Sequence, residues 1–137
     1  MKIQTTRSEL LDHIIFSSKA ISQKTSTFIL SGVLLEADKQ LNIYSTDLET
    51  SIKNTLAVKV LEKGKAVVPA KILINILKNL EESKITLELN KQTNQVCITS
   101  DNARFNLNTL SLEEYPAFPE IDKKEPIRLK QDQFKNL

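Results

Sequence analysis

The predicted order of strands and helices repeats once along the chain, and this repeat limits the possible folds more than any other feature. Each half begins with a short strand, continues with one amphipathic helix and ends with three strand-like segments. The elements are expected at residues 2–6, 6–20, 28–36, 40–45 and 50–60, and again at 65–68, 69–80, 85–89, 96–98 and 105–107. The pattern β-α-β-β-β therefore occurs twice, which indicates an internal duplication.

Both predicted helices have a recognisable start and one apolar stripe. Thr6 and Glu9 have the spacing of a capping box, and Pro69 stands where a proline disturbs a helix least. The stripes consist of Leu10, Leu11, Ile14, Ile15 and Ser18 in the first helix, and of Ile72, Leu73, Ile76, Leu77 and Leu80 in the second. Two equivalent helices should lie side by side on one face of antiparallel sheets, so the fold class expected is α+β.

A local match between the halves supports the duplication. Ile43–Asp47 resembles Cys97–Asp101, and both segments end a predicted strand in a turn that contains a hydroxyl group and an aspartate. Cys97 also lies between two apolar residues, so we expect it to be a small buried residue of the core rather than a reactive thiol.

Composition narrows the class of protein. Hydrophobic residues make up 40% and charged residues 26%, which suits one globular domain with a solvated surface. The net charge of +2 predicts that any grip on nucleic acid is loose. The chain has no apolar signal region at its start and no apolar run near the ~18 residues that span a bilayer, so we expect a cytoplasmic protein without a membrane partner.

The chain divides into a domain and a short tail. Residues 1–120 contain the duplicated unit, and Leu112–Lys124, with nearby prolines, is typical of a connector between domains. Ile127–Leu129 and Gln131–Leu137 are predicted to begin a new strand and helix. Residues 121–137 are therefore interpreted as the connector and the truncated start of a second domain.

Four short sequences, taken in order, resemble the bacterial DNA polymerase III beta subunit, the beta sliding clamp. They are Thr46–Glu49, Val67–Lys71, Ser100–Leu107 and Glu114–Pro116 after Leu110. The resemblance covers the first of that family's three domains and the beginning of the second. It implies a DNA-clamp fold, in which two three-domain subunits close head to tail into a ring, with helices lining the hole.

The resemblance also implies a function and partners. The chain would belong to a non-catalytic processivity factor that encircles double-stranded DNA without sequence preference and needs no cofactor. DNA polymerase III and the clamp loader would bind the full-length homodimeric ring. The family's groove for polymerase peptides is formed by the second and third domains, so this chain should not bind those peptides.

Candidate DNA contacts are lysines on the second helix and in one loop. Lys71, Asn75 and Lys78 share one face of the helix, opposite its apolar stripe, and Lys71 matches a basic residue of the family's inner surface. Lys24 lies in a loop where the family usually has an arginine, and a lysine cannot form the same bidentate contact. The alternative is an ordinary solvated helix face.

The candidate dimer interface is the last strand of the domain together with part of the second helix. In the family this strand is an edge that pairs with the third domain of the other subunit, and an edge strand carries unpaired N–H and C=O groups. The residues assigned to the interface are Ile72, Asn75, Ile76, Arg104, Phe105, Asn106 and Leu107. The alternative is that Phe105 and Leu107 face this domain's own core.

Two other functions remain as alternatives. Asp47, Glu49 and Asp101 would form a two-metal nuclease site if they converged, although the duplication places Asp47 and Asp101 in separate halves. A stand-alone interaction module would use the exposed edge strand. We expect no catalytic residue and no metal site, since His13 is the only histidine and both glycines, Gly32 and Gly64, are isolated.

Overall fold

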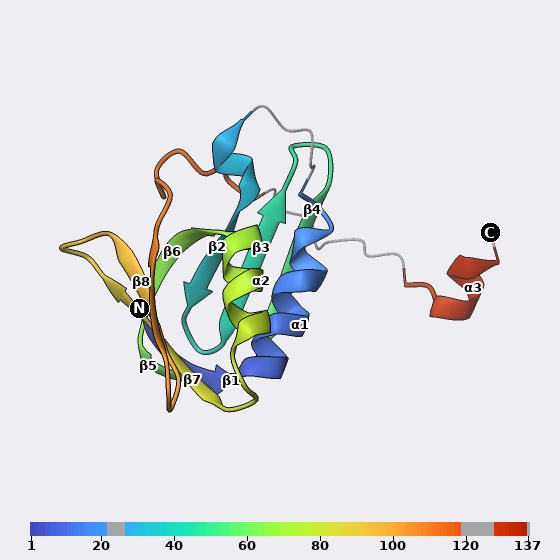
Figure 1. Ribbon diagram of the computed structural model, residues 1–137. Helices are drawn as coiled ribbons and strands as arrows, with labels where there is room; N and C mark the ends of the chain where they lie inside the picture. The colour runs from blue at the N-terminus through green and yellow to red at the C-terminus, as the bar shows by residue number, and fades with distance from the viewer. Residues whose placement is uncertain (22–26, 119–127, 137) are drawn as a thin grey trace.

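The computed structural model describes residues 1–21, 27–118 and 128–136, and it contains both predicted repeats (Figure 1). The first repeat consists of β1 (Lys2–Thr6), α1 (Arg7–Ser18), β2 (Gly32–Ala37), β3 (Leu41–Thr46) and β4 (Ser51–Leu56). The second consists of β6 (Gly64–Pro69), α2 (Ala70–Asn79), β7 (Lys84–Asn90), β8 (Gln95–Thr99) and β9 (Arg104–Asn108). The remaining elements are η1 (Phe28–Ser31), β5 (Lys59–Glu62) and α3 (Gln131–Lys135).

The two repeats exchange their first strands. Sheet 1 has the strand order β5-β1-β7-β8-β9, and sheet 2 has the order β4-β3-β2-β6. Strand β1 thus pairs with β7 of the second repeat, and β6 pairs with β2 of the first, both antiparallel. Each repeat therefore completes the sheet of the other, and the two fold as one unit.

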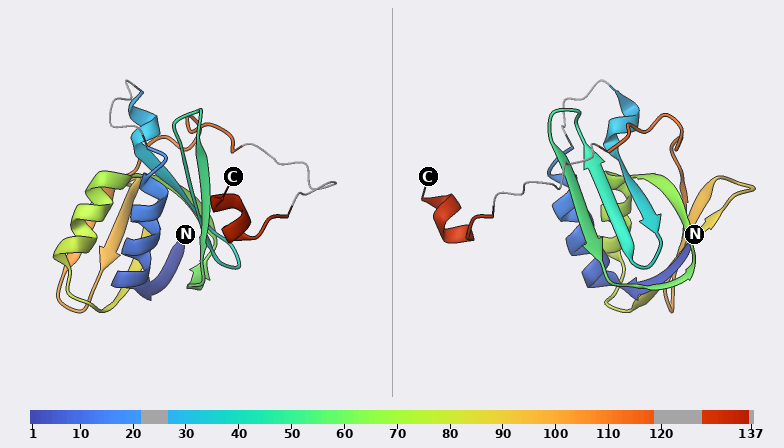
Figure 2. Two further views of the ribbon diagram at one scale, coloured as in Figure 1. Left: turned by 90° about the vertical axis from the view of Figure 1, so that its right-hand side faces the viewer. Right: turned by 180° about the vertical axis from the view of Figure 1, so that it is seen from behind.

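Helices α1 and α2 pack against each other on the same side of the molecule (Figure 2, left). Seen from behind, sheet 2 lies in front of both helices (Figure 2, right). Leu10 and Ile14 of α1 and Leu73 and Leu77 of α2 are fully buried in one core, which also contains the inner faces of both sheets. The α+β fold with two helices side by side is confirmed.

The duplication holds for the elements, but the local match found in the sequence is wrong by one residue. Asp47 N donates to Thr50 O in one turn (3.1 Å), and Ser100 N donates to Ala103 O in the other (2.9 Å). Ser100, and not Asp101, is thus equivalent to Asp47. Because side chains alternate between the two faces of a strand, this shift moves Cys97 to the outer face.

Cys97 is accordingly half-buried, whereas its neighbours Val96 and Ile98 are completely buried. Its Sγ accepts a hydrogen bond from Arg104 Nε (3.1 Å) and lies 3.6 Å from Thr99 Oγ1. The prediction of a core cysteine was wrong.

Three predicted element boundaries also differ. The segment expected as one strand at 28–36 begins with the 3-10 turn Phe28–Ser31, and α1 ends at Ser18 instead of Ala20. The segment at 50–60 is two strands, since β4 belongs to sheet 2 whereas β5 crosses to pair with β1 in sheet 1. No strand is formed by Arg128 and Leu129; Ile127 lies outside the described residues.

The chain after β9 and the first part of the predicted connector fold onto the domain. Leu110 N, two residues before the connector, donates to Val67 O (2.8 Å), and the Tyr115 hydroxyl of the connector donates to Tyr44 O (3.2 Å) on sheet 2. The Phe118 ring lies edge-on to the Tyr44 ring, with 5.0 Å between their centroids. Burial raises the pKa of Tyr115 to about 12. This segment therefore anchors the chain on the outer face of sheet 2 as far as Phe118.

Candidate functional site

The outer face of α2 carries the lysines that the sequence analysis selected. Lys71, Asn75 and Lys78 are all exposed, on the side opposite the buried Leu73 and Leu77. The expected polar face of this helix is therefore present. Ile72, which was placed in the apolar stripe, is 50% exposed instead. It adds an apolar side chain to the solvent side of the helix, where a buried position was expected.

The outer face of α1 differs in charge from that of α2. Its exposed residues are Glu9, Asp12 and Phe16, and the exposed Lys19 follows directly after the helix. The Lys19 Nζ lies 5.5 Å from the centroid of the Phe16 ring, a cation–π distance. The wall formed by the two helices thus has an acidic part on α1 and a basic part on α2. Lys24, the third candidate cation, lies outside the described residues.

Strand β9 is an edge strand, as expected for an interface. It is the last strand of sheet 1, and in the part of the chain that the structure describes no other strand pairs with its outer side. Thr109 N donates to Asn94 O (3.0 Å), and Ser100 N donates to Ala103 O (2.9 Å). These two bonds fix which residues of β9 are hydrogen-bonded to β8.

Hydrogen-bonded and non-hydrogen-bonded pairs alternate along an antiparallel ladder. Between the two pairs just described, Val96↔Leu107 and Ile98↔Phe105 must therefore be hydrogen-bonded pairs. The backbone N–H and C=O groups of the intervening residues point away from β8. These residues are Arg104, Asn106 and Asn108, and all three side chains are exposed.

The side chains of β9 support parts of both interpretations of this strand, as an interface and as part of this domain's own core. Leu107 is buried and Phe105 is partly buried against the core, so both face this domain. Arg104 and Asn106 are exposed, and their backbone groups are free to pair. On α2, Ile76 is partly buried and Ile72 exposed. The candidate interface is thus a free backbone edge accompanied by one exposed isoleucine.

The three carboxylates of the nuclease alternative do not form one site. Asp47 and Glu49 lie in the β3–β4 turn, at the top in Figure 1, and Asp101 lies in the β8–β9 turn at the opposite end. Among the described residues, no group of three or more His, Cys, Asp and Glu side chains could hold a metal ion.

Asp47 has a structural role in its own turn. Its Oδ1 accepts hydrogen bonds from Thr50 N (2.6 Å) and Glu49 N (2.9 Å), and these donors lower the pKa of Asp47. His13 is similarly occupied, because its Nδ1 lies 2.8 Å from Glu9 O within α1.

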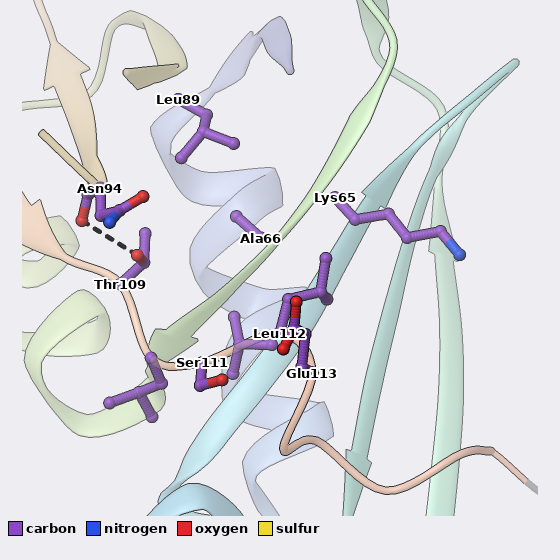
Figure 3. Close-up of a pocket in the computed structure, with 10 residues that line it drawn as sticks. Lys65, Ala66, Leu89, Asn94, Thr109, Ser111, Leu112 and Glu113 are labelled. Atoms are coloured by element: carbon purple, nitrogen blue, oxygen red, sulfur yellow. Dashed lines mark hydrogen bonds between the residues drawn. The ribbon is translucent and has the colours of Figure 1, made fainter. Parts of the chain in front are cut away.

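A surface pocket lies where the chain leaves β9 and crosses β6 (Figure 3). The Thr109 hydroxyl donates to Asn94 O (2.9 Å) on one wall, and Lys65 of β6 lies on the other. Glu113 is the only carboxylate among the lining residues. The pocket has no pair of groups that would serve as nucleophile and base.

Two residues of interest were missed in the sequence. Phe16 is 49% exposed, and it falls between the stripe residues of α1, so its position outside the helical spacing was the signal. Tyr115 is only 9% exposed and fixes the connector to sheet 2. Its burial depends on a contact with a distant strand, which no local pattern reports.

Among the residues that the structure describes, no helix is long and apolar enough to cross a membrane.

The family described as "DNA polymerase III beta subunit, N-terminal domain" matches residues 1–119. The chain is 30% identical to the beta sliding clamp of Staphylococcus epidermidis, over all of the chain and 38% of that protein. It is 29% identical to that of Synechocystis, over 94% of the chain and 35% of that protein.

Solved structures of DNA polymerase III beta subunits are also similar to this chain. The DNA polymerase III subunit beta of Pseudomonas aeruginosa is 25% identical and covers all of the chain, with a TM-score of 0.89 and 37% of that structure matched. The Caulobacter crescentus pol III beta structure is also 25% identical, with a TM-score of 0.81, 87% of the chain covered and 33% of that structure matched. The chain spans less than two-fifths of the length of these proteins.

Proposed function

The chain belongs to the DNA polymerase III beta subunit family, as an N-terminal domain, and from this membership we propose that it forms part of a DNA sliding clamp. In this role it helps a ring to encircle double-stranded DNA and to tether a polymerase. It catalyses no reaction itself. The observation that carries the proposal is the common wall of α1 and α2, since two adjacent helices on one side of the sheets suit a surface that faces DNA.

The proposed DNA contacts are Lys71 and Lys78 on α2, with Lys24 from the segment between α1 and η1. The exposure of Lys71 and Lys78 supports this role, because a lysine must reach a phosphate oxygen without breaking a contact inside the fold. Contacts of this kind carry no base specificity, and a small number of them allows the ring to slide. Asp12 on α1 keeps the total attraction low.

The proposed ring interface is the outer edge of β9. The free backbone groups of Arg104, Asn106 and Asn108 support this role, because a neighbouring strand would pair with all three. Phe105 and Leu107 hold the strand in place from the core side. Ile72, Asn75 and Ile76 of α2 would pack at the same junction.

The remaining parts of the proposal concern the whole protein. Residues 1–120 form the clamp domain, and residues 121–137 form the connector and the start of a second domain. The complete ring is a cytoplasmic homodimer and a non-catalytic subunit of the polymerase holoenzyme. It binds DNA polymerase III and a clamp loader through parts outside this chain.

A charge-reversal experiment tests the DNA-facing wall. Lys71→Glu/Lys78→Glu is compared with Lys53→Glu/Lys91→Glu, which makes the same change in charge on β4 and on the β7–β8 turn. Binding to a labelled duplex is measured by fluorescence anisotropy over a series of low salt concentrations. The α2 variant should bind more weakly, and its log K against log [salt] should lose about two units of slope. Equal losses in both double variants would refute the wall.

A further inference from the structure

We propose that the pocket beside β6 (Figure 3) binds a short extended peptide of a partner protein, which adds a strand to the edge of sheet 2. The peptide places an apolar side chain in the pocket and a basic side chain near Glu113. The described residues that line the pocket all lie outside α1, α2 and β9. The site is therefore separate from the DNA contacts and the ring interface proposed above, and it goes beyond them.

Strand β6 is the edge of sheet 2 opposite β4. On one side it pairs with β2 along its whole length. On its other side, among the described residues, it has a single bridge, in which Leu110 N donates to Val67 O (2.8 Å). The C=O of Val67 therefore points away from β2. Because this direction alternates along a strand, the backbone groups of Lys65 also point away from β2.

The turn between β2 and β3 gives the same phase independently. Asp38 N donates to Gln40 O (3.0 Å), and this bond fixes which residues of β2 are hydrogen-bonded to β3. By alternation, Glu36 uses its backbone groups toward β3 and not toward Lys65, its partner in β6. The N–H and C=O of Lys65 are thus free, since no described strand pairs with the outer side of β6 there. Free groups of this kind are what an added strand pairs with.

The free edge at Lys65 borders a pocket with apolar walls. The pocket has a volume of about 470 Å³ and separates β6 from Leu89 and Asn94 of the β7–β8 hairpin (Figure 3). Leu89 is only partly buried and Leu112 is 44% exposed, so both leucines present apolar surface to the pocket. A peptide strand paired with Lys65 would lie between β6 and Leu89. Since side chains alternate along a strand, every second one would enter the pocket.

The segment that closes the pocket is held at both of its ends. At one end the Thr109 hydroxyl donates to Asn94 O (2.9 Å). At the other end the Tyr115 hydroxyl donates to Tyr44 O (3.2 Å) on the outer face of sheet 2. Residues 111–114, which lie between these two anchors, are exposed. The pocket thus exists without a bound partner, and a preformed site loses less entropy when it binds a peptide.

The charges around the pocket favour a basic side chain in the peptide. The Lys65 side chain extends away from Leu89 and Thr109 (Figure 3), and its Nζ lies 3.1 Å from Glu36 Oε2. Glu113 is the only carboxylate among the described lining residues, and it is exposed. Because the lysine is already paired with Glu36, the pocket presents a net negative charge. A lysine or arginine of the peptide is attracted to it, and an acidic residue is repelled.

An NMR titration of the 137-residue chain tests the site. The probes are blocked peptides of the sequence Thr-Lys-X-Lys-Thr, in which X is leucine, valine or phenylalanine, at concentrations up to about 5 mM. Amide shifts should change at Lys65, Asn94 and Leu112, and amide exchange at Lys65 should slow. Asn106, whose N–H is free on the edge of β9, is the control within the same chain. If none of the peptides shifts these resonances, or if Asn106 responds as strongly as Lys65, the proposal is overturned.

Methylation of the peptide backbone tests for strand pairing. The N–H groups of successive residues in a strand point to opposite sides, so only one of two neighbours bonds to β6. N-methylation of X and N-methylation of the lysine before it should therefore differ: one should weaken binding about ten-fold or more, and the other should have little effect. Equal effects at the two positions would mean that no strand is added. Alanine at X should also weaken binding at least several-fold, and unchanged affinity would refute the apolar pocket.

A charge swap tests the role of Glu113 without changing a buried residue. Glu113→Lys should weaken binding of the lysine peptides at least several-fold and should strengthen binding of Thr-Glu-X-Glu-Thr. Glu114→Lys is the matched control, because it makes the same change at the next exposed residue, which does not line the pocket. The control should keep most of the original affinity for the lysine peptides. Equal losses in the two variants would indicate a diffuse attraction to the acidic segment, and would overturn the proposed site.

Discussion

Gly32, at the start of β2, is required because the chain after β9 crosses directly over it. A Cβ atom at this position would lie 2.8 Å from both Leu110 Cδ1 and Val67 Cγ1. Gly32→Ala should therefore lower the free energy of unfolding by about 1–3 kcal/mol, measured by urea denaturation. Adding Leu110→Ala removes one of the two clashes, and the double variant should lose less than the two separate losses predict. Strictly additive losses would show that the two residues do not interact.

Leu48 occupies a backbone conformation that leucine rarely adopts. Its φ is 77°, and its side chain is 70% exposed, so the residue gains little packing in return. Leu48→Gly should raise the free energy of unfolding by about 0.5–1 kcal/mol, which is the relief of strain less the added entropy of the unfolded glycine. Denaturation that occurs at lower urea would indicate that the Leu48 side chain makes a contact that stabilises the turn.

Glu36 is the centre of a polar network on the outer face of sheet 2. Burial on its own would raise the pKa of Glu36, but hydrogen bonds from Lys65, Asn42 and Tyr44 lower it below the usual value. The distances are 3.1 Å to Lys65 Nζ, 3.2 Å to Asn42 Nδ2 and 3.3 Å to the Tyr44 hydroxyl. The folded state thus favours the carboxylate form.

The stability that the Glu36 carboxylate contributes is present above its unfolded pKa, near the ordinary 4.5, and is lost as pH falls through the lower folded value. Glu36→Gln should therefore cost about 1 kcal/mol at pH 7 and less at pH 3, measured by urea denaturation at both values. Glu113→Gln, at an exposed carboxylate, is the control. A loss that does not change with pH would contradict the assignment.

At the scale of elements, the free edge of β9 can be examined within the monomer. Asn106 has its backbone N–H on the outer side, whereas the N–H of Phe105 is used in the ladder with β8. Asn106→Pro should cost less than about 1 kcal/mol, and Phe105→Pro should cost about 3 kcal/mol or more, both measured by thermal and urea unfolding. The reverse order would mean that the phase of the ladder is wrong.

Periodicity predicted the helices and most strands because it depends on local patterns. The apolar residues of α1 and α2 recur at helical spacing, which predicts a helix. The Thr6–Glu9 pair marks the start of α1, where Thr6 Oγ1 accepts a hydrogen bond from Glu9 N (3.4 Å). The exchange of β1 and β6 between the sheets was not predictable in this way. It depends on pairing between residues far apart in the chain, for which the sequence has no local signal.

The errors at Cys97 and at residues 50–60 have the same physical origin. A short string of similar residues aligned Ile43 with Cys97, although burial aligns Ile43 with Val96. A shift of one residue is hardly visible in sequence, but it moves every side chain to the other face of a strand. Likewise, the change of sheet near Ala57 lies inside a segment in which β-branched residues recur on both sides of it, so the segment has the pattern of one strand. The candidate site residues were found from helical spacing and from the family resemblance, and Phe16 was missed because it fits neither.

At the scale of the whole molecule, the charged helix face and the edges of the sheets are separate surfaces. The helices present charge on one side, basic on α2 and acidic on α1, while β9 and β4 are edge strands of the two sheets. The net charge of +2 on this chain, spread in this way, is consistent with the proposal that the complete ring remains on DNA by surrounding it. Tight binding through phosphate contacts would require a larger excess of basic residues.

The retention of DNA by topology is the most direct measurement of this account. A chimera in which residues 1–119 replace the matching domain of the Staphylococcus epidermidis beta sliding clamp is first shown to be dimeric and then loaded onto a nicked circular plasmid. The account predicts that the chimera stays on the circle at high salt and is released when the plasmid is cut once. A folded, dimeric chimera that leaves circular and linear DNA at the same rate would contradict it.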